Sequence, residues 1–116
     1  QNDFEVGSLP VAQRMRAAYW LKHLYEHADS MPQKKEARQA LEAGMLHPPH
    51  GSLLRHETAY VLGQLRDTNA QGSLEAVLSN ENEDSMLRHE CAEALGAIGV
   101  GEQLLSTLAE PAKESQ

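Results

Sequence analysis

The chain has few of the residues that mark several common protein classes. Its one cysteine, Cys91, cannot form a disulfide within the chain, which fits a reducing compartment. Only 4% of its residues are aromatic, so alanine and leucine must fill most packing positions, and this favours helix-on-helix packing. No apolar run approaches the roughly 18 residues that span a bilayer, and no signal peptide is recognisable. We therefore expect a cytoplasmic protein without a membrane partner.

Positive charge is also scarce, with 10 lysines and arginines against 17 aspartates and glutamates and a net charge of -7. A surface of this sign disfavours nucleic acids and anionic membranes as partners and suits a cationic ligand. An acidic surface that only keeps the protein soluble is the simpler alternative. The 116 residues are enough for one domain with a core of moderate size.

One stretch of sequence occurs twice, at residues 52–63 and 85–96. The two copies begin 33 residues apart, a period typical of stacked helical hairpins. They agree at eight of twelve positions, which are Ser52/Ser85, Leu54/Leu87, Arg55/Arg88, His56/His89, Glu57/Glu90, Ala59/Ala92, Leu62/Leu95 and Gly63/Gly96. A helical repeat needs its apolar residues and its glycine for packing, but it does not need an adjacent histidine and glutamate. The returning His–Glu pair is therefore the strongest indication of a function.

Hydrophobic spacing and cap residues predict an all-α solenoid (an α-α superhelix) of about three helical hairpins, with no strand. The hairpins are expected at about 10–46, 52–78 and 85–109, between a leader at 1–9 and a polar tail at 111–116. Six helices are expected, at about 11–25, 30–45, 52–65, 70–78, 85–98 and 103–108. Ser30, Ser52 and Ser85 are expected to cap three of them.

Each helix is expected to bury one face against the others. The expected core stripes of the two copies are Leu54, Thr58, Val61, Leu62 and Leu65, and Leu87, Cys91, Ala94, Leu95 and Ile98. In the second helix Ala37, Ala40, Leu41 and Met45 are expected to face inward, and Lys34, Lys35, Glu36, Arg38 and Glu42 to face solvent. The first hairpin is a degenerate copy, in which Met15 and Arg16 stand where the others have histidine and glutamate.

The His–Glu pairs are predicted to lie on the face opposite the core stripe, together with Tyr60 and Glu93. Stacked repeats place equivalent residues on neighbouring helices about 10 Å apart, so these side chains can converge. Two imidazoles and a carboxylate with open positions form the facial triad of non-haem Fe(II) oxygen chemistry. The chain supplies this set as His56, His89 and either Glu57 or Glu90. The alternative is a surface pair that recent duplication has preserved.

Two further pairs of histidines are weaker candidates. His23 and His27 are four residues apart and could bind a metal, but they lie in the last turn of a helix, where positive charge is favoured in any case. His47 and His50 flank two prolines, whose extended geometry is expected to splay the rings apart.

The segments LLRHETAYVLGQLRD and SMLRHECAEALGAIG resemble the HEAT-like repeats of deoxyhypusine hydroxylase, which hydroxylates the deoxyhypusine side chain of translation initiation factor five-A. The similarity is close over residues 52–99 and fainter over 14–24. In that family four His–Glu pairs are divided between two facing half-domains that hold a di-iron centre. The resemblance implies that this chain, with two pairs, is one half-domain over residues 10–110, the N-terminal rather than the C-terminal one.

The resemblance also implies roles for the paired residues. His56, His89 and Glu90 would bind one iron, and Glu57 would be the catalytic carboxylate that orients the aminobutyl-lysine chain of the substrate. Tyr60 and Glu93 would contribute to the substrate site. One half alone would hold at most one iron, weakly, and would need a complementary half-domain or a second copy of itself. The alternatives are a non-catalytic HEAT-repeat binding module, similar to those of phycobilin lyases, and a half-domain that is inactive without its complement.

Overall fold

The computed structural model describes residues 10–99, which are all-α with no strand in that range. The helices are α1 (Val11–Glu26), α2 (Met31–Met45), α3 (Gly51–Leu65), α4 (Gln71–Ser79) and α5 (Ser85–Ile98), with the short 3-10 turns η3 (Pro48–His50) and η4 (Thr68–Ala70). The predicted all-α class is confirmed, and five predicted helices agree with these bounds to within two residues. The predicted helix at 103–108, the leader and the tail lie outside the described residues.

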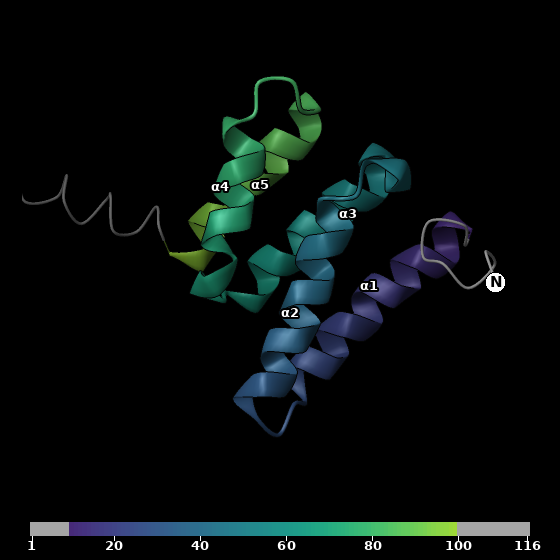
Figure 1. Cartoon of the computed structure of the whole chain (residues 1–116), viewed down its shortest axis with the longest axis vertical. Coiled ribbons are helices and arrows are strands. Elements are labelled where there is room, and N and C mark those ends of the chain that lie inside the picture. Colours follow the sequence, from purple (N-terminus) through teal and green to yellow (C-terminus); the bar gives the residue numbers. More distant parts are fainter. Residues whose placement is uncertain (1–9, 100–116) are drawn as a thin grey trace, which may run out of the picture.

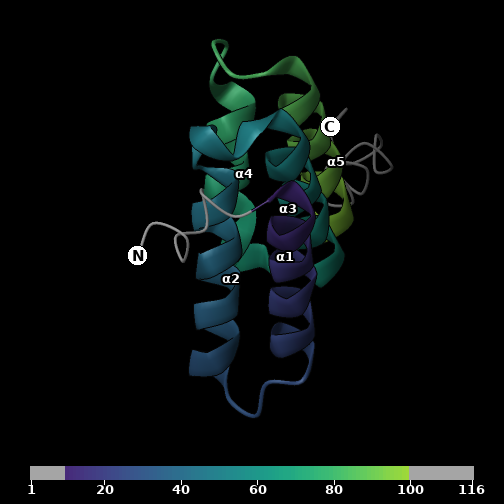
Figure 2. The same ribbon diagram turned by 90° about the vertical axis from the view of Figure 1, so that its right-hand side faces the viewer.

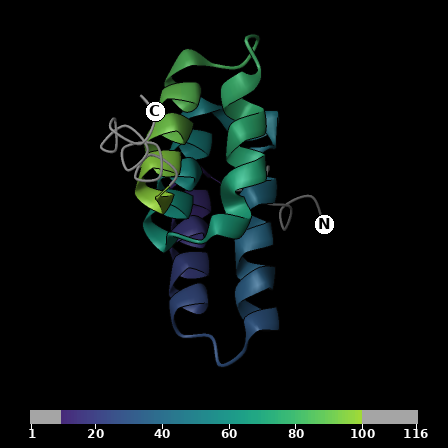
Figure 3. The ribbon, with the colours of Figure 1, turned by 90° about the vertical axis from the view of Figure 1, so that its left-hand side faces the viewer.

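The helices form two layers (Figures 1, 2 and 3). One layer contains α1, α3 and α5, with α3 between the other two, and α2 and α4 form the second layer. α3 packs against both α1 and α5, while α2 packs against α1 and α3 and α4 packs against α5. Residues far apart in the sequence therefore meet along α3. None of the helices in the described range is both long and apolar enough to cross a bilayer.

The core consists of the apolar stripes that the helical period predicts. The side chains buried most completely are Leu41, Met45, Val61, Leu62, Leu74, Leu87 and Cys91. Cys91 is a small core residue, with its Sγ atom 3.8 Å from the Met45 Sδ. Two predictions about the core fail in detail: Leu65 is only partly buried, and Ala40 is exposed.

The helix caps follow the prediction at one of three serines. The Ser30 hydroxyl accepts a hydrogen bond from the Gln33 backbone N–H, as expected. Before α5 the cap is Asp84, whose Oδ2 accepts from the Leu87 N–H at 2.9 Å, so the assignment of Ser85 is wrong by one residue. Ser52 caps nothing among residues 10–99, because η3 runs directly into α3 and the Ser52 position is already helical.

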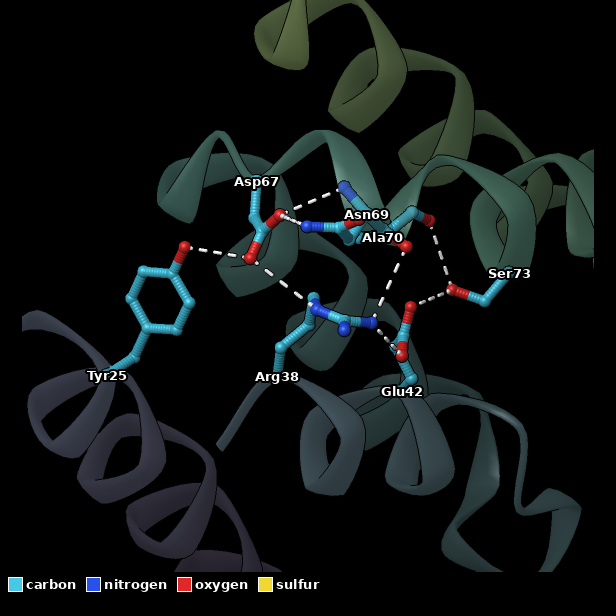
Figure 4. A network of polar contacts seen from close by, with 7 residues as sticks. All are labelled: Tyr25, Arg38, Glu42, Asp67, Asn69, Ala70 and Ser73. Carbon is cyan, nitrogen blue, oxygen red and sulfur yellow. Dashed lines mark hydrogen bonds and ion pairs between the residues drawn. The ribbon is translucent and has the colours of Figure 1, made fainter. Parts of the chain in front are cut away.

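Arg38 is buried, which contradicts its predicted place on a solvent-facing surface. Its guanidinium donates to Glu42 Oε1 at 2.8 Å and lies 3.5 Å from Asp67 Oδ2, which also accepts from the Tyr25 hydroxyl at 2.8 Å (Figure 4). The other oxygen of Glu42 accepts from the Ser73 hydroxyl at 2.8 Å. This network joins α1, α2 and α4 and the turn between α3 and α4, so it fixes the first hairpin against the second.

Candidate functional site

Two of the predicted metal ligands meet where α3 packs on α5. These helices approach closely because Gly63 has no side chain: a Cβ built on Gly63 would lie 2.9 Å from the Ala94 Cα. On the N-terminal side of this contact in both helices, the His56 Nε2 lies 3.5 Å from the Glu90 Oε1. The Glu90 side chain is only 9% exposed, so its prediction as a surface carboxylate is wrong.

Glu57 reaches toward α1, the equivalent helix of the preceding hairpin, as Glu90 reaches toward α3. The α1 position equivalent to His56 is occupied by Met15, so Glu57 meets no imidazole there. Instead the Tyr19 hydroxyl donates to Glu57 Oε1 at 2.9 Å. Burial, together with this hydrogen bond, raises the pKa of Tyr19 to about 12, so the phenol remains a donor at neutral pH. Sequence reasoning missed Tyr19 as a contact, although its alignment with Tyr60 was a usable signal.

His89, the third predicted ligand, is turned toward its own helix. Its Nε2 lies 3.3 Å from the Glu93 Oε2, one turn along α5, and both side chains are more than 60% exposed, at 62% and 63%. Among residues 10–99 no group of three histidine, cysteine, aspartate or glutamate side chains stands close enough to hold a metal. The structure therefore brings His56 and Glu90 together and leaves His89 beside Glu93.

The pair that does meet is suitable for binding a metal ion. Two ligand atoms that each lie about 2.1 Å from one ion are at most about 4.2 Å apart. The 3.5 Å between His56 Nε2 and Glu90 Oε1 is within that limit. A third ligand has to come from a side chain that can move, and the exposed His89 is next to Glu90 in the sequence. The donor types therefore fit a non-haem iron site, and the arrangement fits it in part.

A pocket of about 490 Å³ opens beside this pair, between α1, α3 and α5. Its walls include three carboxylates, from Glu26, Glu90 and Glu93, and the ring of Tyr60. The cations Lys22 and Arg66 also line it. Tyr60 and Glu93 were both predicted to contribute to a substrate site, and the pocket brings them to the same cavity as Glu90. Such a cavity can accept the positively charged end of a long side chain.

The repeated arginines beside the His–Glu pairs hold the hairpins in register. Arg55 Nε donates to the Met45 carbonyl at 2.7 Å, and Arg88 Nε makes the equivalent bond to the Leu78 carbonyl at 2.9 Å. The two remaining nitrogens of Arg55 donate to the two oxygens of Glu83, at 2.9 and 2.7 Å. This hydrogen bonding lowers the pKa of Glu83 below its ordinary value. The repetition of the arginine signals a shared role, and that role is structural.

Other residues with reactive side chains lie away from the pair. The rings of His47 and His50 meet edge to face with centroids 4.6 Å apart, so the prediction that they splay apart is wrong, because residues 48–50 form a 3-10 turn. Burial lowers the pKa of His50, whose Nδ1 lies 3.4 Å from Arg14. Burial also raises the pKa of the Cys91 thiol to about 12, so it is not a nucleophile at neutral pH.

The stacked hairpins and the paired polar positions define a helical-repeat protein in which two adjacent repeats carry the same His–Glu pair. Three deoxyhypusine hydroxylases match about half of the chain. The enzyme of Coccidioides immitis is 47% identical over 61 residues, which are 52% of this chain and 17% of that relative. Those of Emericella nidulans and Gibberella zeae are each 45% identical over 61 residues, which are 53% of this chain and 18% of each relative.

The match thus covers less than a fifth of the length of these curated relatives. No family model matches the chain, and no solved structure gives a significant match. For the matched part of the chain, the predicted resemblance to deoxyhypusine hydroxylase is confirmed, as resemblance to one part of that enzyme.

Proposed function

We propose that this chain is the N-terminal half-domain of a deoxyhypusine hydroxylase, an iron-dependent monooxygenase. The observation that carries the proposal is the match to three enzymes of that name, at 45–47% identity. The contact between His56 and Glu90 supports it, since this contact joins the two repeats through the residues that a metal site needs. The substrate would be the deoxyhypusine form of translation initiation factor five-A, which the enzyme would meet in the cytoplasm.

His56, Glu90 and His89 would hold one iron, with His89 leaving Glu93 to complete the set. His89 is exposed, so its side chain is free to change rotamer and would turn toward Glu90 when the ion binds. Iron bound with open positions would activate O2 for insertion of one oxygen atom into a C–H bond. The three protein ligands would orient the reacting centre above the pocket beside Glu90.

The substrate would be a lysine derivative with a long cationic arm, which suits a pocket lined by three carboxylates and two cations. The Glu26, Glu90 and Glu93 carboxylates line it, and Tyr60 supplies an aromatic wall. Glu57, held by the Tyr19 hydroxyl, would orient the arm as it enters the site. A carboxylate fixed in this way loses less conformational freedom when it binds a cation. This account assigns Glu57 to positioning of the substrate and not to the metal.

The chain alone would be an incomplete enzyme. Residues 10–99 hold no ready group of three metal ligands, since His89 pairs with Glu93. One half would then bind at most one iron, weakly, and turnover would need a complementary half-domain or a facing second copy of the chain. The same observation favours the second candidate, a half-domain that is inactive by itself.

Complementation tests the proposal. The chain is loaded anaerobically with Fe(II), mixed with the C-terminal half of a related deoxyhypusine hydroxylase and given the deoxyhypusine-bearing factor and O2. We expect the factor to gain the mass of one oxygen atom, and His56→Ala or Glu90→Ala to abolish that gain. The control is His47→Ala, which removes an exposed imidazole that contacts His50 and is not part of the proposed site. Product that forms equally well with His56→Ala would reject the proposal, and no product from any pairing would favour the non-catalytic binding module.

A further inference from the structure

An exposed column of three aromatic rings follows the C-terminal half of α1 and its C-cap residue, His27. The Trp20 and His23 rings stack with centroids 5.0 Å apart and planes at 18°. The His23 and His27 rings follow with centroids 4.1 Å apart and planes at 32°. Residues four apart on a helix share one side, so both imidazoles project from the same surface. A second pocket, of about 400 Å³, opens beside the column and includes Glu36 of α2.

The protonation of one imidazole follows from its hydrogen bond. His27 Nδ1 lies 2.9 Å from the backbone carbonyl oxygen of His23. A carbonyl oxygen can only accept, so Nδ1 carries the hydrogen, and in the neutral ring the lone pair is then on Nε2. A hydrogen bond of this kind from the second ring nitrogen is the arrangement that orients histidines bound to metals. His27 is therefore preset to coordinate an ion through Nε2.

The spacing of the two rings suits chelation. Imidazoles bound at adjacent positions of one ion, through nitrogen–metal bonds of about 2.0 Å, have ring centroids roughly 4.5 Å apart. The observed separation of the His23 and His27 ring centroids is 4.1 Å, which is close to that spacing. The preference for positive charge at the C-terminal end of a helix accounts for one histidine there. It does not account for two imidazole rings in contact, one of which has its Nε2 lone pair fixed for coordination.

We propose that His23 and His27 form a chelating site for a divalent ion of a late transition metal, namely Cu²⁺, Ni²⁺ or Zn²⁺. Imidazole ligands suit these ions, and Cu²⁺ is bound most tightly of the three. No third histidine, cysteine, aspartate or glutamate joins the pair among residues 10–99, so water fills the other positions. The site shares no residue with His56, His89 and Glu90, and it stands or falls independently of the proposed enzyme.

The chain contains its own reporter for this site. Trp20 is its single tryptophan and stacks directly on His23. Bound Cu²⁺ should quench the Trp20 fluorescence in a saturable way during a titration at neutral pH. Removal of a residue that only hydrogen-bonds to a metal ligand lowers metal affinity roughly 10-fold. Removal of the ligand itself in His27→Ala should therefore raise the Cu²⁺ concentration at half-quenching by at least that factor. His47→Ala removes an exposed histidine whose ring contacts His50 and not Trp20, so this variant should leave the Trp20 quenching curve unchanged.

A second readout separates binding from collisional quenching. Cu²⁺ should raise the thermal midpoint of the parent chain by more than that of His27→Ala, because the variant lacks one site whose occupation stabilises the folded state. His27 is exposed, so its substitution should leave the circular dichroism spectrum intact. Equal quenching curves for His27→Ala and the parent chain, or quenching that never saturates, would overturn the proposal.

Discussion

Gly63 sets the distance between α3 and α5, and a single methyl group there tests how much the site depends on that distance. In Gly63→Ala the new Cβ would lie 2.9 Å from the Ala94 Cα and 3.0 Å from the Ala94 Cβ. Ordinary carbon–carbon contacts lie at about 3.5–4.0 Å, so the helices must separate locally by about 0.5–1 Å. Because the obstacle is backbone and a Cβ, no side-chain rotation relieves it.

The expected cost is the difference between two effects. Overpacking of this kind costs about 1–3 kcal/mol. Alanine in a helix is favoured over glycine by up to about 1 kcal/mol, which offsets part of that cost. The net destabilisation of Gly63→Ala should therefore be about 0–2 kcal/mol, and each kcal/mol lowers the thermal midpoint of a domain this size by roughly 4–8 °C. Gly72→Ala in α4 is the matched control, since a Cβ there meets nothing within 4 Å among residues 10–99.

Thermal unfolding followed by circular dichroism measures both variants. Gly63→Ala should melt below the parent chain, and Gly72→Ala at or above it. The first variant should also bind Fe(II) more weakly, because His56 moves away from Glu90. A Gly63→Ala chain that melts as high as Gly72→Ala would refute the close approach of α3 and α5, and with it the geometry of the candidate site.

Three other predictions concern single groups. The pKa of Glu83 is lowered in the folded state, so its contribution is present above the ordinary value of 4.5 and is lost as pH falls through the lower folded value. Glu83→Gln should lower the free energy of unfolding at neutral pH by about 1–3 kcal/mol. In urea titrations the fall of that free energy at acid pH should become shallower, and an unchanged fall would contradict this prediction. In Glu57→Gln the pKa of Tyr19, followed by ultraviolet absorbance, should fall from about 12 part of the way toward 10.0. An unchanged pKa would argue against the hydrogen bond between Tyr19 and Glu57. The Cys91 thiol should resist a thiol reagent at mildly alkaline pH until the chain unfolds, so rapid native reaction would contradict its burial.

The helices and most of the core were predictable because they depend on short-range sequence patterns. The stripe from Leu87 to Ile98 repeats with the helical period, and all five of its residues are buried. Arg38 was misplaced because its burial depends on Asp67, 29 positions away, and on the fold of the turn that carries it. The cap at α5 was missed for a smaller reason: Asp84 and Ser85 are both good cap residues, and adjacent candidates differ only in backbone conformation.

The candidate site was predictable in its residues and not in its pairing. Repetition identified His56, Glu57, His89 and Glu90, the resemblance favoured Glu90 over Glu57 as a ligand, and stacking of equivalent helices implied that side chains of neighbouring repeats meet. It could not show that Glu90 reaches back to His56 while His89 turns to Glu93, because that choice depends on rotamers and on competing partners within one helix. Tyr19 was missed because the stacking of repeats places α1 beside α3 but does not show which of their side chains bond to each other.

The central claim is that His56, Glu90 and His89 bind one iron ion. Its most direct test is an anaerobic Fe(II) binding isotherm of the chain, measured in the His27→Ala background so that the pair on α1 does not contribute. We predict at most one bound iron, with an affinity that falls by at least about 10-fold in each of His56→Ala, Glu90→Ala and His89→Ala and not in His47→Ala. An isotherm unchanged by those three substitutions would contradict the account.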